Sequence, residues 1–370
     1  MERNNQLLKS LDFWVGTPLL YCLSLFKRRS VKRTYEIKAI GIFAFAAIGD
    51  SILSSCILDP LRKQYPETKI IIFASKANAG IYSILSGYDE MVILPVTKPL
   101  MVFKVLKKYY LDILIDTSQW TKLSAIYSVL IQANIKIGFK TKGQYRHFGY
   151  DLVVPHSNKV HELKNFQALL KPLGIAFQGS PSLKMEQIET QNLASIGIET
   201  NRPYIIFHPW ASGTRSNQRE WPVDFWVELA KNLIAKDHNI LISGSSHNLA
   251  DSQRLARAIG FENQTVILAG KLLFSQLAKV ILEAKVVISV NTGIAHLADH
   301  LKVPTIVLNG PTNSARWGVV NERSLNIDVP QENGGGFLNL GFEYSHHCPY
   351  IMNQISVQQV QSKIDEMLGN

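Results

Sequence analysis

The chain has 370 residues, more than one hydrophobic core usually supports, so its length favours two domains. Hydrophobic residues make up 46% of it and charged residues only 18%, a composition that excludes a largely disordered protein. The net charge of +10, from 39 Lys and Arg against 29 Asp and Glu, indicates an anionic partner: nucleic acid, an acidic membrane surface or a phosphorylated substrate.

Residues 1–36 differ from the rest of the chain and form an apolar and basic N-terminal arm. The apolar run at 11–26 is shorter than the roughly 20 residues that span a bilayer. Its basic residues come after it, whereas those of a signal peptide precede the apolar core. Five of them lie within seven positions: Lys27, Arg28, Arg29, Lys32 and Arg33.

Two interpretations of this arm remain open. A helix could lie in a membrane interface, with aromatic side chains buried and the basic cluster on anionic head groups. The protein would then be peripheral on the inner face of the cytoplasmic membrane, docked through residues 11–33. The few, widely spaced cysteines favour a reducing cytosol. In the other interpretation, the helix packs on its own domain and the charge run is solvated.

From residue 37 onward, strands and helices alternate. Continuous apolar runs predict strands, and helical spacing predicts helices between them. Fully apolar strands that alternate with helices predict a parallel sheet covered on both faces. The strands are expected at 37–46, 69–74, 90–94, 111–117 and 135–138, and the helices at 51–64, 76–86, 99–109 and 120–132.

Polar, weakly periodic residues at 175–202 separate this region from a second alternation, and we place the boundary after residue 180. The expected fold is therefore α/β, with two doubly wound, Rossmann-like domains at 37–180 and 181–355 and a terminal helix within 356–370. The C-terminal strand ends of the two sheets would face each other across a ligand cleft. Second-domain strands are expected at 204–208, 239–243, 265–268, 285–290 and 305–308, and helices at 222–235, 249–259, 274–283 and 294–300.

The first candidate site is the turn after the first strand, residues 46–51. Gly49 allows a tight turn, and Asp50 follows at the start of the next helix. A carboxylate there could act as a general base toward a hydroxyl nucleophile. It could equally be only a cap of the helix. The turn lacks the GxGxxG pattern of dinucleotide-binding proteins.

The second candidate site is the loop at 208–222, after the first strand of the second domain. Pro222 suits the first turn of the following helix. A loop of this composition could hold a diphosphate, although loops in general are rich in Ser, Gly and Thr. Hydroxyls, exposed backbone N–H groups and positive charge come from Ser212, Gly213, Thr214, Arg215 and Arg219.

The third candidate site lies between a buried strand and a helix at 290–296. Asn291, Thr292 and Gly293 stand where backbone N–H groups and the helix dipole favour a phosphate, and His296 could reach a phosphate oxygen. Ordinary capping and a packed histidine would explain the same residues. No Asp-x-Asp or GxxxxGK[ST] motif occurs, which disfavours a metal-dependent diphosphate site. Cationic side chains and helix N-termini would then stabilise the leaving group.

In this order, the motifs resemble those of the heptosyltransferase-type glycosyltransferases of lipopolysaccharide core synthesis, glycosyltransferase family 9. The resemblance extends from about residue 37 to residue 318. The matching segments are Ala47-Ile-Gly-Asp50, Tyr65-Pro66, Ala211-Ser212, Arg219-Glu-Trp-Pro222, Leu268-Ala-Gly-Lys271 and Asn291-Thr-Gly-Ile-Ala-His-Leu-Ala298, followed by Pro304 and Gly310-Pro-Thr312.

The resemblance implies a GT-B fold, with an acceptor-binding N-terminal domain and a nucleotide-sugar-binding C-terminal domain. It implies an inverting reaction with no metal and no cofactor, in which Asp50 is the general base. Two residues depart from the family pattern, since Arg219 replaces the usual Lys and Asn291 replaces the usual Asp. The residues expected to contact the nucleotide are Ser212, Arg219, Thr292, Gly293 and His296.

A basic, aromatic loop at 140–147 follows a strand of the first domain. Lys140, Lys142 and Arg146 could bind acidic groups of the acceptor, and a solvated loop is the alternative. We therefore expect a glycosyltransferase that moves a heptose or related hexose from a nucleotide sugar to a lipopolysaccharide or other lipid-linked glycan. The alternatives are an epimerase or hydrolase of nucleotide sugars with the same fold, and a non-catalytic nucleotide- or glycan-binding paralogue. Nucleic acid fits poorly, because no recognised binding module is present.

Overall fold

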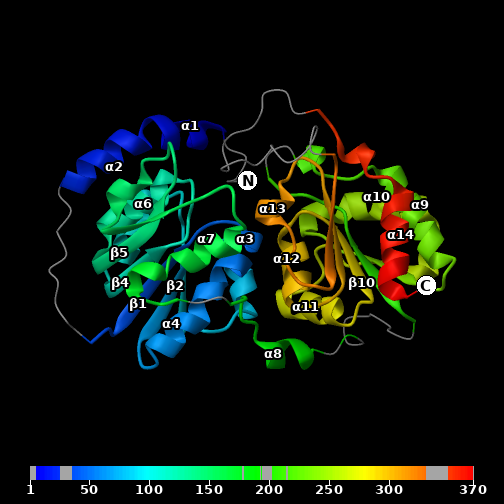
Figure 1. Ribbon diagram of the computed structural model, residues 1–370, viewed down its shortest axis with the longest axis horizontal. Coiled ribbons are helices and arrows are strands. Elements are labelled where there is room, and N and C mark those ends of the chain that lie inside the picture. Colours follow the sequence, from blue (N-terminus) through cyan, green and yellow to red (C-terminus); the bar gives the residue numbers. More distant parts are fainter. Residues whose placement is uncertain are drawn as a thin grey trace. The chain divides into compact units, whose positions relative to one another are not determined.

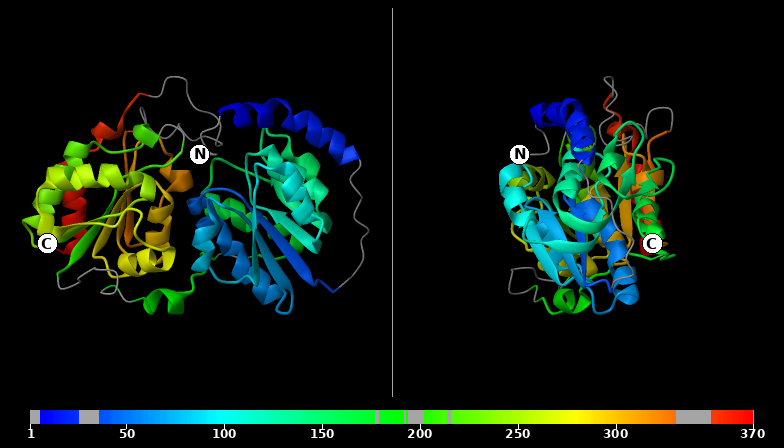
Figure 2. Two further views of the ribbon diagram at one scale, coloured as in Figure 1. Left: turned by 180° about the vertical axis from the view of Figure 1, so that it is seen from behind. Right: turned by 90° about the vertical axis from the view of Figure 1, so that its left-hand side faces the viewer.

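A computed structural model describes residues 6–25, 36–176, 179–191, 193, 202–213, 216–330 and 349–369. The chain divides into two compact units, Met1–Leu183 and Lys184–Asn370. Within the described residues, each unit contains a six-stranded sheet in which all strands are parallel (Figures 1 and 2). In the same part of the chain, no helix has both the length and the apolar character needed to cross a membrane.

The sheet of the first unit has the strand order β3-β2-β1-β4-β5-β6. Five of its six strands form where the apolar runs predict them, and the central ones are buried almost throughout. The order reverses between β1 and β4, and α/β proteins bind ligands at such a reversal. The strands are β1 (Ala39–Ala44), β2 (Lys69–Ser75), β3 (Glu90–Leu94), β4 (Tyr110–Asp116), β5 (Gln132–Lys140) and β6 (Leu152–Pro155).

Several elements of this unit differ from the prediction, which included no helix at Glu162–Ala168. The helix expected at 51–64 is divided by a 3-10 turn, because Pro60 lacks the N–H that a continuous helix would need. The helix expected at 76–86 is only a 3-10 turn, Ala79–Ser83, which contains the weak helix former Gly80. The edge strand β6 was missed because it is short and ends in Pro155. The α-helices that cover the sheet are α3 (Ile48–Ser54), α4 (Leu58–Gln64), α5 (Pro99–Leu106), α6 (Lys122–Leu130) and α7 (Glu162–Ala168).

The N-terminal arm forms two helices, α1 (Gln6–Trp14) and α2 (Gly16–Leu25), which pack on α6 (Figure 1). The Asp12 carboxylate accepts hydrogen bonds from the backbone N–H groups of Lys122 and Leu123, at 3.0 and 2.9 Å. An acidic side chain at this position satisfies unpaired N–H groups and the positive end of the α6 dipole. Leu20 is fully buried against Ala125 and Tyr150. The arm is thus packed on its own domain; the basic cluster at 27–33 lies outside the described residues.

The sheet of the second unit has the order β12-β11-β10-β7-β8-β9, so it repeats the topology of the first and reverses between β7 and β10. Trp221 and Trp226 lie in its main core and stack edge to face, 5.2 Å apart. The strand β12 was not predicted, because residues 324–328 alternate rather than form an apolar run. The strands are β7 (Tyr204–His208), β8 (Asn239–Ile242), β9 (Thr265–Ile267), β10 (Val286–Val290), β11 (Thr305–Asn309) and β12 (Ser324–Asp328).

The helices of this unit lie largely where they were expected. The terminal helix α14 packs on α9 and contributes Val357, Val360 and Ile364 to the same core as the two tryptophans (Figure 1). The helices are α8 (Met185–Glu189), α9 (Val223–Ile234), α10 (Leu249–Ile259), α11 (Phe274–Leu282), α12 (Gly293–His300), α13 (Ser314–Trp317) and α14 (Val357–Leu368).

Candidate functional site

Asp50 lies in the first turn of α3, directly after the strand at which the first sheet reverses its order. Its side chain is half-buried, and Oδ2 accepts a hydrogen bond from Ala47 N at 3.2 Å. The capping role is therefore present. It does not exclude a second role, because an ionised carboxylate has about four acceptor positions.

Asn78, which the sequence analysis did not single out, fixes the turn that carries Asp50. Its amide donates to Ala44 O and to Ser51 Oγ, both at 2.7 Å, and its Oδ1 accepts from Ser75 N at 2.9 Å. This buried side chain ties the ends of β1 and β2 to the start of α3. The signal for it was an Asn three residues beyond a buried strand, where Asn often bonds to nearby backbone.

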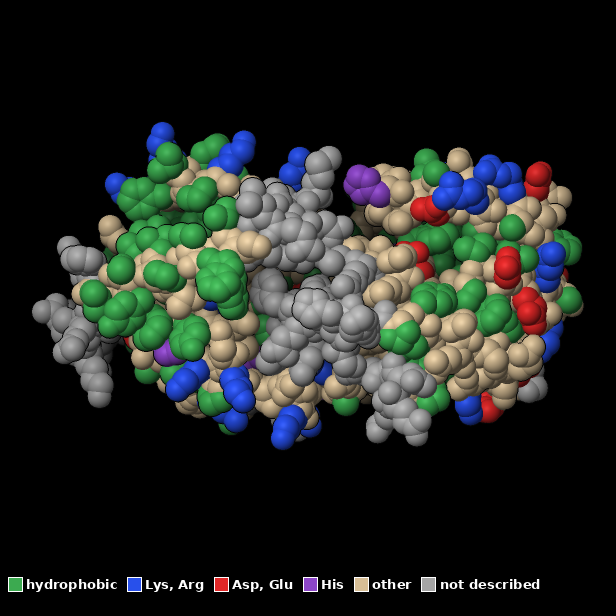
Figure 3. All heavy atoms as spheres, turned by 90° about the horizontal axis from the view of Figure 1, so that it is seen from above, with side chains coloured by type: hydrophobic (Ala, Val, Ile, Leu, Met, Phe, Trp, Pro, Cys, Tyr) green, Lys and Arg blue, Asp and Glu red, His purple; other side chains and the backbone are tan. Residues whose placement is uncertain are grey.

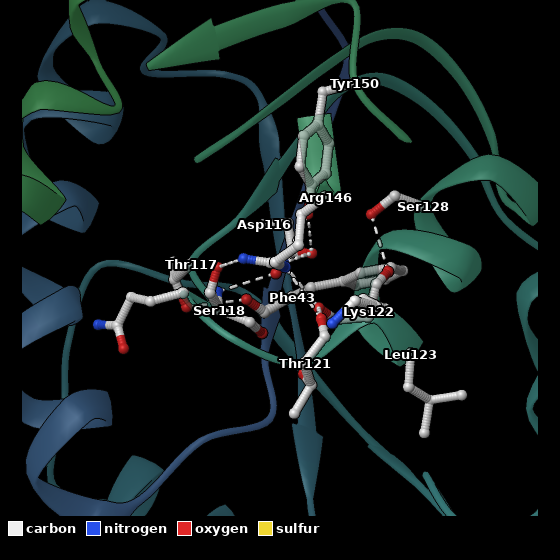
Figure 4. Close-up of polar contacts among 12 residues, drawn as sticks. Phe43, Asp116, Thr117, Ser118, Thr121, Lys122, Leu123, Ser128, Arg146 and Tyr150 are labelled. Atoms are coloured by element: carbon white, nitrogen blue, oxygen red, sulfur yellow. Dashed lines mark hydrogen bonds and ion pairs between the residues drawn. The ribbon is translucent and has the colours of Figure 1, made fainter. Parts of the chain in front are cut away.

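Arg146 does not belong to an exposed acceptor site, and that prediction was wrong. Its side chain is fully buried and forms an ion pair with Asp116, with Nη2 and Oδ2 at 2.9 Å. Figure 4 shows the network that surrounds it. The guanidinium also donates to Thr121 O, Ser118 O, Ser124 Oγ and the hydroxyl of Tyr150.

The same network holds the residues around Arg146 against the end of β4. The hydroxyl of Tyr150 donates to Asp116 Oδ2 at 2.6 Å, and burial holds the pKa of Tyr150 well above its usual value. The hydroxyl therefore keeps its proton. The sequence around Arg146 does not reveal that its side chain is buried, because its partner Asp116 lies 30 residues earlier. Lys140 and Lys142 are exposed, and they remain candidates for acidic groups of an acceptor.

In the second unit, the loop after β7 is tied together at its base. Glu220 Oε1 accepts a hydrogen bond from Ala211 N at 3.0 Å, and Arg219 Nη2 donates to the carbonyl of Ser212. Gly213 has a φ of +92°, a conformation that favours glycine, and a Cβ there would meet open space. Thr214 and Arg215 lie outside the described residues.

His208, at the end of β7, begins the loop of the second candidate site, and sequence reasoning gave it no role. It is buried, and its Nδ1 lies 2.8 Å from Ser243 Oγ. Burial lowers the pKa of His208 to about 4, so the ring is neutral at physiological pH. A polar residue at the C-terminal end of a buried strand was the available signal.

The residues between β10 and α12 form the third part of the site. Thr292 is the N-cap of α12, Gly293 is its first residue, and His296 is buried one turn later. The first N–H groups of a helix have no partner within the helix and attract anions. The amide of Asn291 is used within the unit, since Nδ2 donates to Asn309 Oδ1 at 2.8 Å and to Trp317 O at 2.9 Å.

The two candidate donor loops begin next to each other at the C-terminal edge of the second sheet. β7 and β10 are adjacent parallel strands, with His208 opposite Ser289. The loop at 208–222 follows one of them and the segment at 290–296 follows the other, so both extend from the point at which the strand order reverses. Among the described residues, no three His, Cys, Asp or Glu side chains lie together as a metal ion would require.

The model of glycosyltransferase family 9 (heptosyltransferase) matches residues 100–335. The chain is 25% identical over 311 residues to the lipopolysaccharide core heptosyltransferase OpsX of Haemophilus influenzae, covering 80% of this chain and 86% of that protein. The match to the family model extends over the first unit beyond β3 and over most of the second.

Solved structures share the fold. E. coli ADP-heptose lipopolysaccharide heptosyltransferase II superposes with a TM-score of 0.73 at 19% identity, over 90% of this chain and 98% of that one. E. coli heptosyltransferase WaaC with ADP gives a TM-score of 0.68 at 20% identity, over 89% and 99% of the two chains. The two-sheet architecture is thus that of the GT-B fold.

Proposed function

The chain belongs to glycosyltransferase family 9, the heptosyltransferases, and from this membership we propose that it transfers a heptose, or a related hexose, from an ADP-sugar to a lipopolysaccharide core acceptor. The main structural support for the donor-binding site is the pair of loops that follow β7 and β10, where the strand order of the second sheet reverses. The donor nucleotide is suggested by the similar enzymes, because E. coli heptosyltransferase WaaC has been solved with ADP and with ADP-2-deoxy-2-fluoro heptose.

The donor diphosphate binds at the N-terminus of α12 in this proposal. The N–H groups of Gly293 and its neighbours, together with the Thr292 hydroxyl, contact phosphate oxygens, and the helix dipole stabilises their charge. Arg219 supplies the positive charge that the usual Lys supplies elsewhere in the family. His208 contributes no charge, because its ring is neutral. These groups stabilise the leaving diphosphate without a metal ion.

The acceptor reacts at the first unit. Asp50 accepts the proton of the acceptor hydroxyl as that oxygen attacks the anomeric carbon of the sugar. The new carbon–oxygen bond forms as the bond from the anomeric carbon to the diphosphate breaks, and ADP leaves with the electron pair. Attack from the face opposite the leaving group inverts the anomeric configuration. Lys140 and Lys142 attract acidic groups of the acceptor.

We further propose that the arm docks the protein on the inner face of the cytoplasmic membrane. Figure 3 shows hydrophobic side chains gathered over the part of the molecule where α1 and α2 lie. The seven large ones in the described part of the arm have exposed fractions of 44% to 74%: Leu11, Phe13, Trp14, Val15, Leu19, Tyr21 and Leu25. Such a contiguous apolar face indicates an interaction surface.

Charge complementarity favours a lipid surface as the partner. Five basic residues follow the apolar face in the sequence, and residues 1–38 carry eight Lys and Arg against three Asp and Glu. Each basic residue near anionic lipid contributes at most about 1 kcal/mol, which makes docking reversible. A lipid-linked acceptor would lie at the same surface.

The test of docking uses point substitutions rather than deletion, because deletion would also remove Asp12 and Leu20 from the fold. The triple change of Phe13, Trp14 and Leu25 to Ser should move the protein from anionic vesicles to the supernatant on sedimentation. The control is Val223→Ser, since Val223 is similarly exposed, at 46%, in the second unit. Equal sedimentation of the triple variant and the wild type would refute the docking face.

The test of the reaction incubates the protein with a panel of nucleotide sugars and truncated lipopolysaccharide, with and without EDTA. Transfer is expected with ADP-heptose, with inversion and without loss in EDTA. Transfer that EDTA abolishes would overturn the metal-independent mechanism. Turnover of the donor without any acceptor would instead favour a hydrolase, and donor binding without turnover of any kind a binding protein.

A further inference from the structure

Three asparagines in the second unit form a hydrogen-bonded chain that begins at the candidate donor site. Asn291 follows β10, Asn309 ends β11 and Asn326 lies on β12. Asn291 Nδ2 donates to Asn309 Oδ1 at 2.8 Å, and Asn309 Nδ2 donates to Asn326 Oδ1 at 3.3 Å. Asn309 is fully buried, and Asn291 and Asn326 are half-buried on either side of it.

At both ends of this series of asparagines, backbone groups determine which amide atoms donate and which accept. Asn326 bonds to Val319 through both halves of its amide, since Nδ2 donates to Val319 O at 3.0 Å and Oδ1 accepts from Val319 N at 3.1 Å. At the other end, Trp317 O accepts from Asn291 Nδ2 at 2.9 Å. A carbonyl oxygen only accepts and an N–H only donates, so none of the three amides can be reversed without losing bonds.

This arrangement leaves the side chain of Asn291 able to accept a hydrogen bond but not to donate one. Both hydrogens of its amide group are engaged, and no partner of its Oδ1 is found in the described part of the chain. Asn291 is half-buried and immediately precedes the N-cap of α12. Its carbonyl oxygen can therefore accept a hydrogen bond from a ligand, but its amide cannot donate one.

We infer that Asn309 and Asn326 are positioning residues that hold Asn291 so that its Oδ1 accepts a hydrogen bond from a hydroxyl group of the donor. The inference rests on the proposed function and adds the chemistry that this position recognises. The hydroxyl belongs either to the ribose or to the transferred sugar. The position is neutral, so it brings no negative charge near the diphosphate.

The same geometry explains why Asn, rather than the Asp usual in the family, suits position 291 of this protein. A carboxylate at this position would place one oxygen where Nδ2 lies, against Trp317 O and Asn309 Oδ1, which are both acceptors. Asn309 could present its amide group only by giving up its bond to Asn326. The identity of residue 291 is therefore coupled to the identity of residue 309.

A double-mutant cycle tests the positioning role. ADP and ADP-heptose are titrated calorimetrically, without acceptor, into the wild type, Asn291→Ala, Asn309→Ala and the double variant. Loss of one hydrogen bond should weaken binding about three- to tenfold in each single variant. Because Asn309 acts through Asn291, the Asn309→Ala change should have no further effect in the Asn291→Ala background.

The two ligands distinguish the sources of the hydroxyl. A loss seen with ADP assigns it to the ribose, and a loss seen only with ADP-heptose assigns it to the sugar. Equal losses from Asn309→Ala in both backgrounds would overturn the positioning role. Unchanged affinity of Asn291→Ala for both ligands would overturn the inference while leaving the proposed function intact. A wild type that binds neither ligand would overturn both.

Asn291→Asp provides a second variant that nearly preserves shape. At pH 8 its carboxylate opposes two acceptors, so we expect ADP-heptose, which carries both candidate hydroxyls, to bind about tenfold more weakly than to the wild type. At pH 5.5 partial protonation lets the side chain donate to one of them, and the difference from the wild type should narrow. Affinity equal to that of the wild type at pH 8 would contradict the inference.

Discussion

The two sheets share one strand order and differ in the charge of the groups at the point of reversal. The first unit places Asp50 there and supports the neighbouring strand end with a buried ion pair, Asp116 with Arg146. The second unit places a neutral histidine, His208, and a neutral amide, Asn291, beside the N-terminus of a helix. A negative group suits a proton acceptor and a neutral or positive edge suits a diphosphate. In the proposed function, one topology therefore supports two different tasks.

The strongest challenge to this comparison is the removal of the charge from Asp50. Asn can still accept the hydrogen bond from Ala47 N, so Asp50→Asn removes the base and retains the cap. Turnover should fall about a hundredfold to ten-thousandfold, as expected for loss of a general base. The control is Asp224→Asn, an exposed carboxylate in the first turn of α9, which should leave turnover unchanged.

The buried ion pair of the first unit should matter for stability rather than for recognition. Arg146→Met leaves Asp116 buried without its partner, and we expect a loss of about 3–5 kcal/mol of unfolding free energy, measured by urea denaturation. The exposed Lys142→Met should cost less than about 0.5 kcal/mol. Equal small losses in both variants would show that the network does not support the unit.

Replacement of Arg219 tests whether positive charge in the second unit contributes to binding of the diphosphate. Loss of a charged hydrogen bond to a phosphate should weaken ADP binding by about tenfold or more in Arg219→Gln, measured by calorimetry. Arg257→Gln, an exposed cation in the last turn of α10, is the matched control and should bind as the wild type does. If both variants bound ADP equally well, Arg219 would not contact the donor.

The neutral state of His208 predicts a specific dependence of stability on pH. The pKa of His208 is about 4 in the folded protein and about 6.5 in an unfolded chain, so only the unfolded state binds the proton between these values. As pH falls through this window, this group should reduce stability by up to about 1.4 kcal/mol per pH unit. Denaturation of His208→Gln should show a shallower decline between pH 6.5 and 4. Identical slopes would place the folded pKa of His208 near its ordinary value.

Local pattern was enough to predict most of the fold. Long apolar runs such as 285–290 identified the central strands, because strands buried on both faces consist almost entirely of apolar residues. Elements with weak local signals were missed, such as β6, which ends in Pro155, and β12, which alternates. The 3-10 turn before Pro60 was missed because the periodicity of 51–64 is helical throughout.

The positions of the candidate site residues were predictable where a residue follows a buried strand and unpredictable where burial decides what the side chain contacts. Asp50, Thr292 and Gly293 lie at the starts of the helices that follow buried strands, as expected. Arg146 was misassigned, because its partner Asp116 is distant in the sequence and only the fold brings the two together. The same limit applies to the asparagine chain, whose members are separated by 18 and 17 residues.

The division of tasks between the units is tested most directly by the affinity of Asp50→Asn for ADP, measured by calorimetry on the preparation used for turnover. If the first unit supplies the base and the second holds the donor, this variant should bind ADP as tightly as the wild type while its turnover is lost. A fall in ADP affinity that matches the fall in turnover would contradict the account, because Asp50 would then belong to the donor site.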